Sequence, residues 1–290
     1  MHDRAAVGWP TSLWVVRHGE SAGNIAREHA ESNAAEIIDI AERDIDVPLS
    51  DLGERQARAL GEWIAGMDPA DLPTLVVASS YARAIQTAEI TMQAAGLDVP
   101  LRIDERLRER EFGVLDRLTR LGIRERFPQE AALRSRLGKF YHRPAGGESW
   151  TDVIARVRST LADLRMDAPG ERLLVVAHQV VVLSFRYVLE ELTEQDILAV
   201  DREADVANCS LTRFEIDPAS GDGRPRLVSW NETAPVEVAG EQVTREPDRA
   251  DVASESASES ASESASVSAS NAAPQHADEQ LAPVSGRERD

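Results

Sequence analysis

Three short apolar runs, each followed by a helical pattern, constrain the fold of this 290-residue chain more than any other feature. The runs are LWVVR (13–17), TLVVAS (74–79) and RLLVVAH (172–178). Strands that are apolar throughout are buried on both faces, and their alternation with helices is typical of a parallel sheet covered by helices on each side. The sequence therefore predicts an α/β fold, a three-layer αβα sandwich with a mostly parallel central sheet.

Apolar spacing and capping residues indicate three helices and two further strands. Serine is favoured just before a helix begins, and glycine is favoured where a helix ends. The predicted helices span 51–66, 81–96 and 150–166, after Ser50, after Ser79 or Ser80, and after Ser149, and the second ends at Gly96. Two late runs, 210–216 and 225–230, alternate apolar and polar residues and predict outer, antiparallel strands.

Two polar segments, 24–47 and 118–141, separate the predicted elements. The first is rich in Ala and Glu and predicts one or two helices, and the second is a helical insert rich in arginine. Ligands of α/β sheets bind at the carboxyl ends of the strands. We therefore expect these inserts to lie over a site at that edge of the sheet.

The C-terminal segment differs in composition from the rest of the chain. From Ala253, the run ASESASESASESASVSAS contains almost no large side chain, so it cannot bury enough apolar area to offset the entropy of ordering. We predict a single domain over 1–237 and a disordered acidic tail over 238–290. The tail holds 11 acidic residues and 4 arginines, a net charge of −7 out of −19. A docking or regulatory role, with an unknown partner, is the alternative to a solvated tail.

Charge and composition exclude several classes of protein. The net charge of −19 argues against a nucleic-acid or anionic-membrane partner. No run approaches the ~18 apolar residues of a membrane span, and no signal peptide is recognised. Cys209 is the only cysteine, which rules out an intrachain disulfide and suits a reducing cytosol, so we expect a cytoplasmic protein. There is no H-E-x-x-H motif and no cysteine pair, so we expect neither a metal site nor a cofactor.

The stretch LWVVRHGESAGN (13–24) offers two competing nucleophiles. GESAG fits the G-x-S-x-G elbow of serine hydrolases, with Ser21 as the nucleophile. That elbow follows a central strand, with several strands earlier in the chain, whereas only about a dozen residues precede it here. The other interpretation places Arg17 and His18 at the end of the first strand, and we favour it.

Further cations and a second histidine follow the other predicted strands. Arg83 lies in the first turn of the helix after the second strand, and His178 ends the last parallel strand. Arginine forks bind phosphate oxygens, and a neutral imidazole can attack phosphorus. If the strands are neighbours, Arg17, His18, Arg83 and His178 form a phosphoryl-transfer site. Taken singly, each residue has a plainer interpretation, as a core histidine or a surface arginine.

The residues around His18 also match a known family. RHGESAGN (17–24) resembles the signature of the histidine phosphatase superfamily, the phosphoglycerate mutase-like proteins. The resemblance extends from Leu13 to Thr233 through PLSDLGERQA, SSYARAIQTAE, LREREFG, RPAGGESWTDV and VVAHQ, spaced motifs in the same order. It implies a three-layer α/β fold, a metal-free site and a phosphohistidine intermediate.

The resemblance also implies roles for individual residues. His18 corresponds to the nucleophile, while Arg17, Arg83 and His178 correspond to the groups that bind the transferring phosphoryl. The candidates for substrate binding are Ser21, Asn24, Arg143 and Gln179. Each of these roles is an expectation that the resemblance implies.

Glu109 lies in an E-R-x-aromatic-G pattern (109–113) that matches the proton donor of the family. It belongs to a charged run, DERLRERE, and such a run is usually a solvated face. Glu111, two residues away, therefore remains a rival. A donor carboxyl must be protonated when the leaving group departs, so we expect burial to raise its pKa.

Sequence context favours a phosphatase. Gln179 follows His178 where many relatives have glycine, and AHQVVVLSFRYVLEEL, GGESWTDVIARV and RERFPQEAALRSR resemble the fructose-2,6-bisphosphatase and sugar-phosphatase branch. We predict a metal-independent phosphomonoesterase that acts on small phosphorylated metabolites through a phosphohistidine.

Two alternatives stay open. A 2,3-bisphosphoglycerate-dependent phosphoglycerate mutase needs extra cations to hold its acceptor and exclude water. Cations in or beside the second insert that suit this role are Arg124, Arg134, Arg136, Lys139 and Arg143. The second alternative is a catalytically silent phosphate-binding scaffold whose acidic tail carries the function. The intact set of site residues argues against it.

Overall fold

The computed structural model describes residues 8–216 and 224–246, and six strands form one sheet within them. The strands are β1 (Ser12–Arg17), β2 (Leu75–Ser79), β3 (Leu101–Asp104), β4 (Arg172–Ala177), β5 (Leu211–Ile216) and β6 (Pro225–Glu232). Their order is β3-β2-β4-β1-β5-β6. The first four in this order are parallel, whereas β5 is antiparallel to β1 and to β6. The mostly parallel sheet and the two antiparallel outer strands are confirmed.

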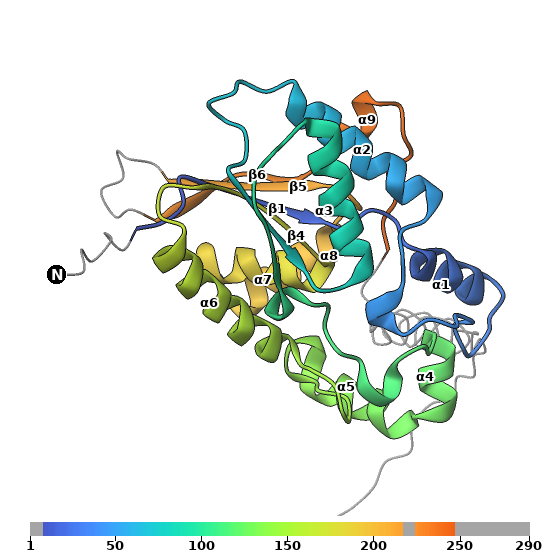
Figure 1. Ribbon diagram of the computed structural model, residues 1–290. Helices are drawn as coiled ribbons and strands as arrows, with labels where there is room; N and C mark the ends of the chain where they lie inside the picture. The colour runs from blue at the N-terminus through green and yellow to red at the C-terminus, as the bar shows by residue number, and fades with distance from the viewer. Residues whose placement is uncertain (1–7, 217–223, 247–290) are drawn as a thin grey trace, which may run out of the picture. The chain divides into compact units, whose positions relative to one another are not determined.

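Alternate residues of the central strands fill two separate cores. Leu13 and Val15 of β1 pack on one face of the sheet, and Trp14 and Val16 pack on the other. The helices that cover the first face are α6 (Trp150–Asp167) and α7 (Gln179–Leu189), and those that cover the second are α2 (Asp51–Ala65) and α3 (Ala82–Ala95) (Figure 1). Burial on both faces explains why the strand sequences are apolar without interruption, and it confirms the three layers.

The helix caps follow the sequence at two helices and depart from it at one. Ser50 caps α2 by accepting the backbone N–H of Gly53, and Ser149 caps α6 in a capping box. The predicted cap of α3 by Ser79 or Ser80 is wrong, because the residue in the N-cap position is Tyr81, which makes no side-chain capping bond. Gly96 ends α3 in the left-handed conformation, as predicted.

The two inserts pack together on the side to which β1 points (Figure 1). They contain α1 (Ala22–Ser32) and the 3-10 turn η1 (Asp44–Asp46) in the first, and α4 (Arg120–Arg126) and α5 (Pro128–Tyr141) in the second. The N–H of Ile38 donates to the carbonyl of Arg117 at 2.8 Å, and that of Thr119 donates to Glu36 at 3.1 Å. The first insert therefore forms one helix and then an irregular segment held by the second insert.

Residues beyond α9 (Ala234–Val238) continue to contact the body of the domain. Gln56 of α2 donates to the carbonyl of Gln242 at 2.8 Å, and the N–H of Asn208 donates to the carbonyl of Thr244 at 3.0 Å. These contacts extend the folded unit past the predicted boundary at residue 237. We call residues 241–246 the C-terminal strap. The rest of the predicted tail, 247–290, lies outside the described residues.

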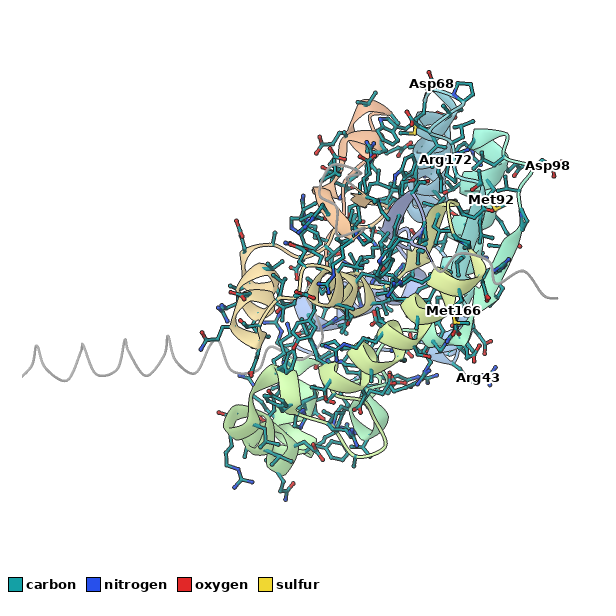
Figure 2. All side chains as sticks on the ribbon, turned by 90° about the vertical axis from the view of Figure 1, so that its left-hand side faces the viewer. Arg43, Asp68, Met92, Asp98, Met166 and Arg172 are labelled. Carbon is teal, nitrogen blue, oxygen red and sulfur yellow. The ribbon has the colours of Figure 1, made fainter. Side chains whose placement is uncertain are left out.

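The remaining short elements complete the described chain. They are η2 (Glu105–Leu107), η3 (Gly113–Leu115) and α8 (Glu194–Glu203). Charged side chains such as Arg43, Asp68 and Asp98 project at the periphery (Figure 2). Within the part of the chain that the structure describes, no helix is long and apolar enough to cross a membrane.

Candidate active site

The two histidines predicted at strand ends lie side by side. β1 and β4 are neighbours in register, with Arg17 opposite Ala177, so the residue that follows each strand lies at the same edge of the sheet. Those residues are His18 and His178, whose ring centroids are 5.1 Å apart. Their exposed fractions are only 3% and 0%. The convergence expected of a parallel sheet is present.

The ring of His18 is held in one tautomer. Its Nδ1 lies 2.7 Å from the carbonyl oxygen of Gly19, and since a carbonyl only accepts, Nδ1 carries the proton. Nε2 therefore has a lone pair, and Nε of Arg83 donates to it at 3.3 Å. The site presents an unprotonated ring nitrogen next to a buried cation, which is the form of imidazole that can attack an electrophile.

Burial keeps both histidines neutral. It lowers the pKa of His18 well below its ordinary value of 6.5, and the charges of Arg83 and Arg17 act in the same direction. The hydrogen bond to the Gly19 carbonyl opposes this shift without outweighing it. Burial also lowers the pKa of His178 well below 6.5, again assisted by Arg83. Two neutral imidazoles thus face each other in a cationic surrounding.

His178 is oriented by a hydroxyl group at the end of β2. The Oγ of Ser79 lies 2.8 Å from Nε2 of His178 and accepts the N–H of Tyr81 at 3.3 Å. The Ser79 hydroxyl can donate a hydrogen bond to Nε2, and in that arrangement the ring proton of His178 lies on Nδ1. That Nδ1 is buried and has no hydrogen-bond partner among the described residues. A buried donor in this state favours a ligand with an acceptor oxygen.

Arg17 is fixed from the side of α7. Its Nη1 donates to Oε1 of Gln179 at 3.0 Å and also to the carbonyl of Val206. Gln179 in turn donates to Asp205 at 3.2 Å, so its amide is held in the orientation that accepts from Arg17. Gln179 lines the pocket and positions the arginine there.

Arg83 is fixed from the side of the first insert. Its Nη1 donates to the carbonyl of Asp44 at 2.6 Å and lies 3.2 Å from the Asp44 carboxylate. Its guanidinium carbon lies 4.8 Å from the centroid of the Tyr81 ring. Only 5% of Arg83 is exposed, so the plainer interpretation of a surface helix residue does not hold.

The structure places Glu109 and Glu111 differently. Glu109 is partly buried, lines the same pocket as His18, and accepts the N–H of Arg110 at 2.8 Å. The Glu111 side chain is 49% exposed and accepts the Tyr81 hydroxyl at 3.0 Å. In the described part of the chain, Glu109 lines this pocket and Glu111 does not.

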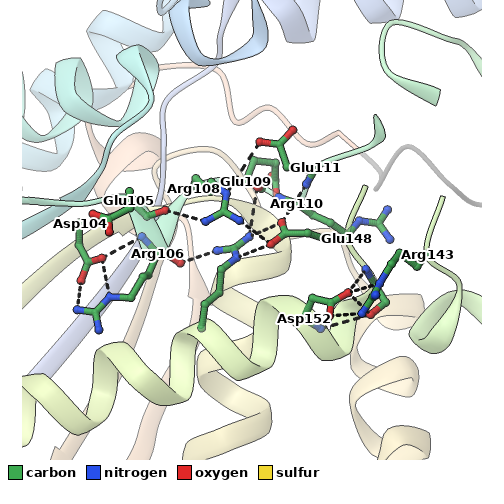
Figure 3. A network of polar contacts seen from close by, with 12 residues as sticks. Asp104, Glu105, Arg106, Arg108, Glu109, Arg110, Glu111, Arg143, Glu148 and Asp152 are labelled. Carbon is green, nitrogen blue, oxygen red and sulfur yellow. Dashed lines mark hydrogen bonds and ion pairs between the residues drawn. The ribbon is translucent and has the colours of Figure 1, made fainter. Parts of the chain in front are cut away.

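A network of ion pairs holds the backbone that carries Glu109 (Figure 3). Nη2 of Arg156 donates to the carbonyl of Glu109 at 3.2 Å. Both Arg156 and Arg108 bind the carboxylate of Glu148, at 3.1 and 2.8 Å. Because Arg156 of α6 binds the backbone carbonyl of Glu109, the loop that carries the Glu109 carboxyl is fixed in position.

Ser21 and Asn24 form the N-terminal capping box of α1. Ser21 Oγ accepts the N–H of Asn24 at 3.2 Å, and Asn24 Oδ1 accepts the N–H of Ser21 at 2.8 Å. Both residues line the pocket. The Ser21 hydroxyl donates to Asn24 rather than to a histidine that could activate it for attack.

The cations of the second insert do not line the pocket of His18 in the described part of the chain. Arg143, expected at the substrate, is exposed and forms a two-armed ion pair with Asp152 at the start of α6 (Figure 3). Lys139 pairs with Asp201. Arg124 and Arg136 are exposed and Arg134 is buried elsewhere. The geometry therefore does not support substrate contact by Arg143.

Three charged pocket residues were not singled out from the sequence: Arg27, Asp44 and Glu246. They share one pocket with His18 and Glu109. Arg27 follows Asn24 by three positions on α1, so helical spacing held a signal for it. Glu246 is 219 positions from Arg27, and no local pattern marks such a contact.

No group of three or more potential metal ligands occurs among the described residues. The polar groups that face the pocket are mainly arginine, histidine and carboxylate side chains, which are linked by hydrogen bonds and ion pairs. A tetrahedral oxyanion fits this donor set, because guanidinium forks and a ring N–H match its oxygens.

Comparison with protein families gives a match to the model of the histidine phosphatase superfamily (branch 1) over residues 13–233. A phosphoglycerate mutase that depends on 2,3-bisphosphoglycerate, from Rhizobium etli, is 30% identical over 196 residues, covering 66% of this chain and 86% of the mutase. The 6-phosphofructo-2-kinase/fructose-2,6-bisphosphatase of Gallus gallus is 30% identical over 187 residues. That match covers 64% of this chain, which spans about a third (34%) of the length of the bifunctional protein.

Solved structures give the same fold. A mycobacterial glucosyl-3-phosphoglycerate phosphatase, solved with VO3, superposes with a TM-score of 0.59 at 28% identity. The superposition covers 76% of this chain and 99% of the phosphatase. Both phosphatases and mutases are thus among the proteins that this chain resembles.

Proposed function

Since this chain belongs to the histidine phosphatase superfamily, we propose that it is a metal-independent phosphomonoesterase that forms a phosphohistidine at His18. Its substrates are small phosphorylated metabolites of the cytoplasm. The observation that carries the proposal is the state of His18: a buried, neutral ring whose unprotonated Nε2 faces Arg83.

In the first step, Nε2 of His18 attacks the phosphorus atom of the bound monoester. The N–P bond forms and the bond from phosphorus to the ester oxygen breaks. Arg17 and Arg83 hold the equatorial oxygens, and Nδ1–H of His178 donates to one of them. The carboxyl of Glu109 gives its proton to the leaving oxygen, so an alcohol departs instead of an alkoxide.

In the second step, water attacks the phosphorus of the phosphohistidine. Glu109, now a carboxylate, takes a proton from that water, and the N–P bond breaks to release inorganic phosphate. His18 regains its lone pair and Glu109 its proton, so the cycle closes without a metal ion.

The lowered pKa of His18 predicts activity that persists in mildly acidic solution. The neutral ring is the active form, and a folded pKa below the ordinary 6.5 means that protonation removes it only at lower pH. We expect kcat/KM for p-nitrophenyl phosphate to be level through pH 6.5 and to fall only below it. An acid limb centred at or above pH 6.5 would show that His18 is not the buried neutral group described.

A mutase is the second candidate, because a mutase is among the relatives and Arg27 adds a cation to the pocket. It is the weaker one on this geometry. A mutase must hold a second anionic acceptor while excluding water. The insert cations suited to that role are exposed or engaged elsewhere, as Arg143 is with Asp152.

We expect phosphate release to dominate over isomerisation. The assay supplies 3-phosphoglycerate with a catalytic trace of 2,3-bisphosphoglycerate and follows both 2-phosphoglycerate and free phosphate. The assay is run with and without EDTA, because the mechanism uses no metal ion, and p-nitrophenyl phosphate serves as the reference substrate. Isomerisation much faster than phosphate release would make the chain a mutase, and activity lost in EDTA but restored by a divalent cation would contradict the metal-free route.

A further inference from the structure

The C-terminal strap places a carboxylate inside the catalytic pocket. Oε1 of Glu246 accepts from Nη1 of Arg27 at 3.0 Å, and Oε2 lies 3.6 Å from Nη2 of Arg17. The side chain of Glu246 is 16% exposed, and those of Arg27 and Arg17 are 6% and 5% exposed. All three line the pocket that contains His18. A buried cation beside the nucleophile thus holds an anion supplied by the chain itself.

The strap is anchored to the loop that carries the nucleophile. Gln56 donates to the hydroxyl of Thr244 at 3.0 Å, and that hydroxyl donates to Oδ1 of Asn208 at 3.0 Å. Nδ2 of Asn208 in turn donates to the carbonyl of His18 at 2.9 Å. The chain of bonds sets Glu246 against Arg27 and Arg17, so its position follows from the fold of the domain.

Arg27 differs in its position from the arginines assigned to the transferring phosphoryl. Arg17 and Arg83 flank His18, whereas Arg27 lies on α1, one turn beyond Asn24 of the capping box. A guanidinium binds a carboxylate and a phosphate with the same donor geometry. The carboxylate of Glu246 therefore marks where a second negative group of a ligand can be held.

We propose that Arg27 is a second anion subsite of the catalytic pocket, and that preferred substrates carry a carboxylate or a second phosphate that displaces Glu246 from it. This inference rests on the proposed function, since it names the substrate class of the same site. Glu246 competes with that group from within the chain. A substrate with a single anionic group leaves Glu246 bound to Arg27 and gains no affinity from Arg27.

Binding of non-hydrolysable ligands separates the subsite from turnover. Phosphonoacetate and 3-phosphonopropionate carry a phosphonate and a carboxylate at two spacings, and methylphosphonate carries the phosphonate alone. Calorimetry with the full chain measures their Kd values. Of phosphonoacetate and 3-phosphonopropionate, one should bind the unmodified protein more tightly. We expect Arg27→Gln to weaken the binding of that ligand by roughly 10- to 100-fold, the scale of a hydrogen bond between charged groups. The affinity for methylphosphonate should change much less.

Glu246→Gln should act in the opposite direction. Removing the internal competitor is expected to tighten the same carboxylate ligand by about 10-fold relative to methylphosphonate. If Arg27→Gln does not fold, the Glu246→Gln variant alone tests the proposed subsite. The matched controls are Arg126→Gln and Glu36→Gln, which break a half-exposed ion pair outside the pocket lining and should leave the ratio of affinities unchanged.

The inference fails if neither variant changes the ratio of affinities, or if both ligand types shift by the same factor. In those cases the Glu246–Arg27 pair only stabilises the fold. The proposed function fails separately, if the unmodified chain hydrolyses no phosphomonoester while the affinity ratios still depend on Arg27. If hydrolysis requires His18 but ligand affinity does not depend on Arg27, the subsite proposal fails and the proposed phosphatase function stands.

Discussion

We expect His18→Ala to lower the turnover of every phosphomonoester by more than about four orders of magnitude, the scale seen when a covalent nucleophile is removed. The reason is that, in the proposed mechanism, Nε2 of His18 forms the first bond to phosphorus. His178 is not placed to replace it, because its Nε2 lies 2.8 Å from the Ser79 hydroxyl. Steady-state hydrolysis of p-nitrophenyl phosphate, with the melting temperature as a check on folding, measures the loss.

A matched histidine variant separates chemistry from general damage. His29 lies in the last turn of α1, is exposed, and does not line the pocket in the described part of the chain. His29→Ala should therefore keep kcat within a few-fold of the unmodified protein. If His18→Ala also kept most of its activity, the phosphoryl group would have to be transferred without this side chain.

The second large effect is expected at Glu109. Glu109→Gln should slow the hydrolysis of alkyl phosphates by roughly two to four orders of magnitude, because an alkoxide leaves poorly without a proton. The loss should shrink for p-nitrophenyl phosphate, whose leaving group needs no proton. A series of leaving groups of increasing pKa, assayed with both forms, measures this as a steeper dependence in the variant.

Glu111→Gln is the control for this prediction, since Glu111 is exposed and binds Tyr81 outside the pocket lining. We expect it to change the leaving-group dependence little. A loss in Glu109→Gln that is uniform across leaving groups would make Glu109 a positioning residue. A steeper dependence in Glu111→Gln would move the donor role to Glu111.

The sequence predicted the elements whose pattern follows from burial. Residues 13–17, 74–79 and 172–178 are apolar because both faces of their strands are covered, and they lie where expected as β1, β2 and β4. β3 was missed because it is an edge strand, and two of its four residues, Arg102 and Ile103, are exposed. An edge strand need not be apolar, so its sequence carries little signal.

The candidate site divides in the same way. The convergence of His18 and His178 follows from the rule that parallel strands end at one edge, and a sequence can express that rule. The contact of Glu246 with Arg27 joins residues 219 positions apart, and it depends on where the strap runs. Arg143 was misplaced for a different reason: its charge suited a phosphate, but the carboxylate of Asp152, nine positions further along the chain, binds it instead.

Covalent phosphorylation tests the central claim most directly. The chain is mixed with substrate, quenched in alkali during turnover and digested, and the modified residue is located by mass spectrometry. The account predicts a phosphate on His18 that survives alkali and is lost in acid, and that is absent from His18→Ala. An acid-stable phosphate on Ser21, or a phosphate on any side chain other than His18, would contradict it.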